Sequence, residues 1–153
     1  MAQTLEMKRI HPEAKLPRRG TPASVGLDIY ALLVSETGRF NTALIPPRTT
    51  RIIRTGLCVK PPEGYAVFVC SRSGLSANDS VFVTNAPGVV DPDYRGELMV
   101  LLYNGGHESY YVKHEDRIGQ IILLPCEPID VRWVENLDMN TPRGTAGLGS
   151  TGR

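Results

Sequence analysis

The chain has 153 residues, a length typical of one domain with a core of its own. Its formal net charge of +1 excludes a strong general attraction to nucleic acid or to acidic membranes. No apolar run reaches the roughly 18 residues that a membrane span needs, and the first residues lack the basic start and apolar stretch of a secretory signal. We therefore expect a cytoplasmic protein that binds neither membrane nor nucleic acid.

Short segments rich in Val, Ile, Leu and Tyr follow one another along the chain, separated by Gly and Pro, and this pattern predicts β-strands. The predicted strands cover residues 27–34, 49–59, 65–70, 81–84, 97–103, 109–112, 118–124 and 129–134. Residues 73–78 are expected to form one helical turn. Many short strands with turn signals between them indicate an all-β sandwich or barrel.

Two further features of the sequence concern a possible anion-binding site and the cysteines. Arg72, Ser73 and Gly74 follow one predicted strand and precede the helical turn, where a helix N-terminus beside an arginine favours anions. Alternatively, Ser71 or Ser73 caps the helix and the arginine is solvated. The cysteines Cys58, Cys70 and Cys126 show no metal-site spacing, and we expect free, reduced thiols in or near the core.

Residues 88–97 have the sequence Gly-Val-Val-Asp-Pro-Asp-Tyr-Arg-Gly-Glu. They place carboxylates and turn-forming residues directly before the apolar run at residues 98–103. Asp91 and Asp93 flank a proline, and Tyr94 follows at once. A rigid loop that presents a carboxylate beside an aromatic ring suits a binding or catalytic site. An ordinary acidic turn is the alternative. Further along, Gln120 stands between apolar residues, and the residues alone favour a solvent-facing amide there.

The amino-acid composition of the chain changes near residue 137. Residues 137–153 are rich in Gly, Thr and Ser and have no apolar periodicity, so we expect one β domain over 1–136 followed by a mobile arm. Glycines bring backbone N–H groups close to an anion, hydroxyl groups add donors, and Arg143 can fork onto phosphate oxygens. A disordered terminus is the alternative for such a segment taken alone.

Five segments resemble the five motifs of the trimeric deoxyuridine triphosphatase (dUTPase) family, and they occur in the family's order. They are residues 24–29, 71–75, 88–97, 117–121 and 143–152. The resemblance implies a distorted jelly-roll β-barrel or sandwich with a flexible C-terminal arm. It implies hydrolysis of dUTP to dUMP and pyrophosphate, which limits uracil in DNA and supplies dUMP for dTMP synthesis. It also implies Mg²⁺ and a homotrimer whose active sites are shared between subunits.

The resemblance assigns roles to the residues around Asp91. Asp91 would orient and deprotonate the water that attacks the α-phosphorus. Asn85 and neighbouring backbone groups would read the uracil edge, in a hairpin formed by residues 81–84 and 89–90. Tyr94 would pack flat on the deoxyribose and exclude a 2′-hydroxyl. The other residues expected around the base are Val89, Val90 and Met99.

The resemblance also implies a set of phosphate contacts and an arm that closes over the nucleotide. Asp28 would hold a metal-bound water or brace the site, with Mg²⁺ held mainly by the triphosphate. Leu148 stands where the family usually has an aromatic residue that stacks on uracil, and Val25 replaces the usual Ala. The residues expected to bind the phosphates or to close over the nucleotide are Arg72, Ser73, Gly74, Gln120, Arg143, Leu148, Gly149, Ser150 and Thr151.

Two other functions remain open at this point. A dCTP deaminase would share the fold and differ in base chemistry, although the 143–152 motif and the Asp91–Tyr94 segment favour the hydrolase. A catalytically silent binding protein is the second alternative, and the presence of Asp91, Arg72, Gln120 and Arg143 argues against it. A regulatory protein partner is not predictable from the residues.

Overall fold

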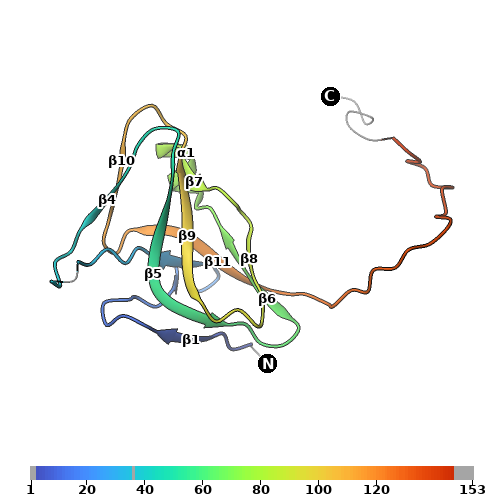
Figure 1. The fold of residues 1–153 in the computed structure, drawn as a ribbon, viewed down its shortest axis with the longest axis horizontal. Coiled ribbons are helices and arrows are strands. Elements are labelled where there is room, and N and C mark those ends of the chain that lie inside the picture. The colour runs from blue at the N-terminus through green and yellow to red at the C-terminus, as the bar shows by residue number, and fades with distance from the viewer. Residues whose placement is uncertain (1–2, 36, 147–153) are drawn as a thin grey trace.

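The computed structural model describes residues 3–35 and 37–146. In this part of the chain, two larger β-sheets and a two-stranded ladder enclose one hydrophobic core, and an extended segment leaves the body at the C-terminal end (Figure 1). The expected all-β class is confirmed. In the same ranges, no helix has the length and apolar character to cross a membrane.

All strand pairs are antiparallel. The first sheet has the order β1 (Glu6–Arg9), β5 (Thr50–Lys60), β9 (Glu97–Asn104) and β7 (Val81–Val83). The second has the order β2 (Arg18–Arg19), β3 (Leu27–Tyr30), β11 (Arg117–Pro125), β6 (Tyr65–Cys70) and β8 (Gly88–Val90). The ladder pairs β4 (Thr42–Ile45) with β10 (Tyr110–Lys113), and the helix is α1 (Ser73–Asp79).

Alternation along β9 shows how the core is built. Leu98, Val100 and Leu102 are buried, whereas the residues between them face away from the core. This period of two is what a strand with one covered face requires. Buried positions on β3, β4, β5, β6, β7, β8, β10 and β11 belong to the same cluster.

A β-bulge interrupts the pairing of β5 with β9 between Arg54 and Cys58. Gly56 within it has a φ of +70°, a conformation that glycine adopts without strain. A Cβ at this position would lie 2.7 Å from both Ala14 Cβ and Leu32 Cδ2, so the close packing also requires glycine. The bulge is fixed to the start of β9, because Thr55 Oγ1 donates to the carbonyl oxygen of Leu98 at 2.6 Å.

Several strand predictions differ from the structure. The strand predicted at residues 65–70 is confirmed, whereas the strand predicted from residue 27 ends at Tyr30. Three strands, β1, β2 and β4, were not predicted. β1 and β2 are short and largely polar, and β4 is an apolar segment of only four residues, so none of them supplies a long apolar run. The predicted strand at 129–134 is wrong, since this segment has no strand partner here and Ile129, Val131 and Trp133 are exposed.

The predicted hairpin of residues 81–84 and 89–90 is also wrong. β7 pairs with β9 in the first sheet, whereas β8 pairs with β6 in the second. The turn between them therefore carries the chain from one sheet to the other. Turn residues signal a change of direction, but they do not decide which strands pair afterwards. The cysteines also depart from expectation, since Cys58 and Cys70 are half-buried but Cys126 is exposed; all three are free.

Candidate active site

A cavity of about 220 Å³ opens between β8, the loop after it and the outer side of β9. Its wall includes Gly88 and Glu97 in addition to residues that the sequence predicted. The structure brings six of the predicted site residues together around this cavity. These are Asn85, Val89, Val90, Asp91, Tyr94 and Met99.

The loop that carries Asp91 and Tyr94 is held by its own hydrogen bonds. The backbone N–H of Tyr94 donates to the carbonyl oxygen of Asp91 at 3.2 Å, which closes a turn. Arg95 Nη1 donates to the carbonyl oxygens of Pro92 and Tyr94, at 2.6 and 2.8 Å. The Asp91 carboxylate is exposed at the cavity rim, where water and a phosphate can reach it.

Gly88 determines where the amide of Asn85 lies. A Cβ on Gly88 would lie 2.9 Å from Asn85 Nδ2, closer than side-chain atoms approach a Cβ. The glycine therefore lets the amide pack across the backbone at the cavity wall. An amide held there presents one donor and one acceptor to a flat heterocycle.

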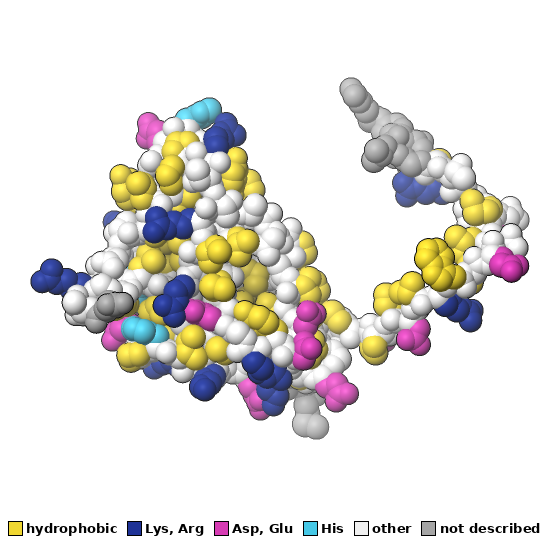
Figure 2. All heavy atoms as spheres, in the orientation of Figure 1, with side chains coloured by type: hydrophobic (Ala, Val, Ile, Leu, Met, Phe, Trp, Pro, Cys, Tyr) yellow, Lys and Arg dark blue, Asp and Glu magenta, His cyan; other side chains and the backbone are white. Residues whose placement is uncertain are grey.

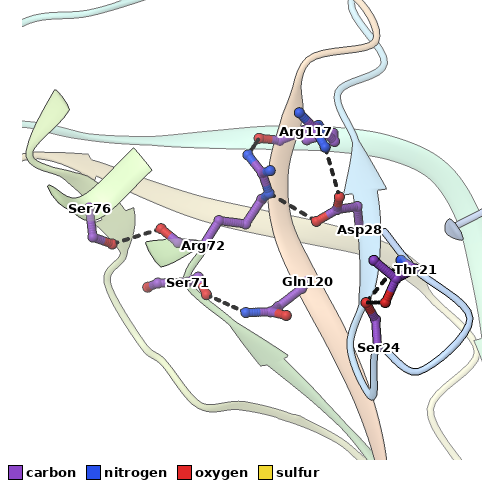
Figure 3. A network of polar contacts seen from close by, with 8 residues as sticks. All are labelled: Thr21, Ser24, Asp28, Ser71, Arg72, Ser76, Arg117 and Gln120. Carbon is purple, nitrogen blue, oxygen red and sulfur yellow. Dashed lines mark hydrogen bonds and ion pairs between the residues drawn. The ribbon is translucent and has the colours of Figure 1, made fainter. Parts of the chain in front are cut away.

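A second cluster lies where β3, β11 and the end of β6 meet (Figure 3). Asp28 on β3 accepts from two guanidinium groups, with Arg72 Nε 2.9 Å from Oδ1 and Arg117 Nη1 3.3 Å from Oδ2. Arg72 Nη1 also donates to the carbonyl oxygen of Arg117 at 3.3 Å. Only 16% of the Asp28 side chain is exposed. Two cations that share one carboxylate leave a net positive charge, which suits a polyanion.

Gln120 belongs to this cluster and does not face solvent, which corrects the prediction from the residues alone. Its Nε2 donates to the carbonyl oxygen of Ser71 at 2.9 Å (Figure 3). Its Oε1 lies over Gly26, where a Cβ would collide with it. A side chain at position 26 would therefore displace the Gln120 amide from this position.

The helix-cap alternative for this segment is not supported. Ser73 is the first residue of α1, Arg72 occupies the cap position, and no side chain caps the helix. Ser71 Oγ accepts instead from the backbone N–H of Val83, at 2.9 Å. The N–H groups of Ser73 and Gly74 belong to the first helical turn, which has no intrahelical acceptors for them.

The donor set restricts how a metal ion could bind. Among the described residues, no group of three His, Cys, Asp or Glu side chains is placed to hold one. Asp28 is taken up by two arginines, which disfavours direct ligation of a cation. Each of its oxygens keeps a further lone pair, so Asp28 fits a hydrogen bond from a metal-bound water.

The two clusters lie apart within one chain. Val67 of β6 is paired with Val90, and Asp91 continues beyond that pair, away from Arg72. Five residues separate Val67 from Arg72, which at about 3.3 Å per residue is roughly 16 Å. The phosphate cluster and the Asp91 cavity therefore lie toward opposite ends of β6.

The arm residues do not join either cluster in the described structure. Arg143 Nε donates to the carbonyl oxygen of Ala146 at 3.1 Å, within the extended segment that leaves the body (Figure 2). Leu148, Gly149, Ser150 and Thr151 lie outside the described residues. Two residues without a role in the sequence analysis are prominent here, Arg117 and Glu97. Only the neighbouring strands reveal their contacts.

Comparisons with known proteins give a consistent result. The dUTPase family model matches residues 12–152. The deoxyuridine 5′-triphosphate nucleotidohydrolase of Anaplasma marginale is 40% identical, with 90% of this chain and 88% of the relative covered. That of Syntrophotalea carbinolica is 37% identical, with 97% of each chain covered.

Solved structures show the same fold. The dUTPase of Staphylococcus bacteriophage 80alpha, determined with dUpNHpp, has a TM-score of 0.86 and 24% identity, covering 99% of this chain and 100% of its own. A variant dUTPase from phage phi11 of S. aureus, described with a structural Mg(II) ion, has a TM-score of 0.77 and 21% identity. It covers 89% of this chain and 99% of its own.

Proposed function

The chain belongs to the dUTPase family and hydrolyses dUTP to dUMP and pyrophosphate, and we propose that the Asp91 cavity holds the deoxyuridine while the Arg72 cluster holds phosphates. The observation that carries this division is the cavity itself, which gathers a carboxylate, an amide and an aromatic ring. The deaminase alternative is disfavoured because the two relatives described above are nucleotidohydrolases.

Asn85 and the neighbouring backbone groups select uracil. Uracil offers O4 as an acceptor and N3–H as a donor, and cytosine reverses both. A site with fixed hydrogen-bonding groups leaves them unpaired against the wrong base, which discriminates strongly. Val89, Val90 and Met99 supply the apolar contacts around the ring, and Tyr94 packs on the deoxyribose.

Asp91 acts as the general base. Its carboxylate orients a water toward the α-phosphorus and accepts a proton as the new P–O bond forms. The bond from the α-phosphorus to the bridging oxygen then breaks, and pyrophosphate leaves with the electron pair. Arg72, Gln120 and the N–H groups of Ser73 and Gly74 hold the phosphate oxygens and stabilise their charge.

Mg²⁺ accompanies the triphosphate in this proposal. When bound, it supplies positive charge that screens the phosphates, and it keeps several of its waters. Asp28 would accept a hydrogen bond from one of those waters, and it keeps Arg72 and Arg117 in place. Arg143, Leu148, Gly149, Ser150 and Thr151 close over the nucleotide as the arm.

A complete site requires more than one chain. The separation of the Asp91 cavity from the Arg72 cluster supports a homotrimer whose sites draw on neighbouring subunits. The outer face of the first sheet exposes Ile52, Phe82 and Met99 by 57%, 38% and 42%. Exposed apolar faces of this kind mark protein interfaces. The exposed Ile129, Val131 and Trp133 also alternate as a strand does when a neighbouring surface covers one face.

The substitution Asp91→Asn tests the proposed mechanism. The amide keeps the shape of the loop but is a poor base, so turnover should fall by about 10²–10⁴-fold while a non-hydrolysable dUTP analogue still binds. Assays should follow pyrophosphate from dUTP and ammonia from dCTP with the unsubstituted protein. Turnover close to normal in Asp91→Asn contradicts the role of Asp91, whereas ammonia release from dCTP contradicts the assigned reaction.

A further inference from the structure

We infer that Glu97 is a positioning residue that fixes the Tyr94 ring and thereby sets the preference for deoxyribose over ribose. The inference rests on the proposed packing of Tyr94 against the sugar. Glu97 lies at the start of β9, beside the cavity, and contacts the Asp91 loop on one side and the β5 bulge on the other.

The first contact fixes the aromatic ring. Tyr94 Oη donates to the carbonyl oxygen of Glu97 at 2.9 Å. The ring folds back over Gly96, where any Cβ would collide with ring atoms. Tyr94 is 40% exposed, so packing alone does not confine it. Its orientation therefore depends on the single hydroxyl bond and on where the Glu97 carbonyl stands.

The second contact fixes that carbonyl. Glu97 Oε1 accepts from the backbone N–H of Gly56 at 2.7 Å, and Oε2 accepts from Arg54 Nε at 2.9 Å. The Glu97 side chain is only 13% exposed, and charge-assisted bonds of this kind are short and strong. The buried bulge thus anchors the residue whose backbone oxygen holds the ring.

The β5 bulge therefore influences, through Glu97 and Tyr94, how closely the aromatic ring approaches the sugar of the nucleotide. A 2′-hydroxyl is excluded only if the ring face stays close to the sugar, and a ring that tilts admits it. Loss of the Glu97 carboxylate releases the first residue of β9 and, with it, the acceptor for Tyr94. The effect should appear in the ratio of kcat/KM for dUTP to that for UTP.

The first test is Glu97→Ala. The dUTP-to-UTP ratio of kcat/KM should fall by about 3- to 10-fold, the worth of one hydrogen bond. Thr55→Val is the matched control, because it removes a buried hydroxyl bond in the same bulge without touching Glu97. It should lower Tm and leave the ratio unchanged. An unchanged ratio in Glu97→Ala, or an equal loss in Thr55→Val, overturns the inference.

Three further variants test whether Glu97 acts through the Tyr94 hydroxyl. Tyr94→Phe removes the hydroxyl donor and should lower the ratio as Glu97→Ala does. In the double variant, the second substitution should add little, because both break one contact. Independent, multiplying effects contradict the link. Glu97→Gln keeps an oxygen for the Gly56 N–H and should restore most of the ratio, and absence of rescue contradicts the anchor.

Tyr94→Ala separates this inference from the proposal beneath it. If the ratio stays high in Tyr94→Ala, the sugar contact of Tyr94 is wrong, whatever Glu97 does. If the ratio collapses there but survives in Glu97→Ala, the sugar contact holds and the positioning role of Glu97 is wrong.

Discussion

Asp28 illustrates, at the scale of single residues, how one carboxylate organises a cationic site. It holds Arg72 and Arg117 from two different elements, and both guanidinium groups would repel each other without it. The sequence analysis left two roles open for Asp28, a metal-bound water or a brace. The ion pairs support the brace as its main role.

We expect Asp28→Asn to lower kcat/KM for dUTP by about 10- to 100-fold, because misplaced groups lose the geometry of the reaction. The preference for uracil should not change, since the cavity around Asn85 is built by other elements. Glu115→Gln is the control, as it breaks an ion pair with Lys15 without removing a group that is bonded to Asp28. Full rescue by excess Mg²⁺ would instead indicate that Asp28 acts mainly through a metal-bound water.

Tyr110 provides a residue-scale prediction about pH. Burial raises the pKa of the Tyr110 phenol above its usual value, and the Asp79 and Asp116 carboxylates add to the effect. The unfolded chain therefore ionises first as pH rises. The contribution to stability is fully present below about pH 10 and is lost above it. Tm of the protein should fall more steeply above pH 10 than Tm of Tyr110→Phe, and parallel curves would contradict this.

At the scale of elements, the arm and the β domain contribute to different properties of the protein. Residues 138–146 are exposed and have no strand partner in the described structure, whereas the core cluster ends with Leu123 of β11. Stability should therefore reside in the strands, and the arm should serve the reaction.

Truncation after Leu137 should leave Tm nearly unchanged, because residues 138–146 are exposed and bury no apolar area in the described structure. Hydrolysis of dUTP should collapse, since Arg143 and the Gly-Ser-Thr donors leave with the segment. A double substitution of the exposed Arg39 and Glu63 to Ala, away from the cavity, serves as a surface control for Tm and activity. Normal turnover in the truncated protein would show that the arm takes no part in catalysis.

At the scale of the whole molecule, shared sites lead to a complementation experiment. A chain with Asp91→Asn and a chain with Arg72→Ala each lack one half of every site. In mixed trimers, an intact Asp91 cavity meets an intact Arg72 cluster from the other chain. About a quarter of the sites should be complete after random one-to-one mixing in a closed ring.

Activity that reappears when the two inactive variants are refolded together supports sites shared between chains. Mixtures as inactive as their components contradict it. Trp133 is the only tryptophan and is fully exposed in the single chain, so its emission gives a separate readout of assembly. A blue-shifted emission at concentrations where sedimentation gives a trimer mass places Trp133 in an interface.

The all-β class, most of the central strands and six residues around the cavity follow from the amino-acid sequence. Strand 65–70 and β9 are continuous apolar runs in the sequence, so neighbouring residues suffice to identify them as strands. The Asp91–Tyr94 loop is likewise formed by adjacent residues, and its turn residues predict a rigid loop without information about distant parts of the chain.

Which strands pair follows only from the three-dimensional fold, and it changed two predictions and revealed one contact that the sequence did not indicate. β7 and β8 separate into different sheets, Gln120 turns to the carbonyl of Ser71, and Glu97 anchors the β5 bulge. Each depends on residues that are distant in the chain, and local propensity carries no information about them. At residues 129–134 the local pattern predicts a strand that the described structure does not contain. An alternating apolar segment forms a strand only when the edge of another strand is available to pair with its backbone.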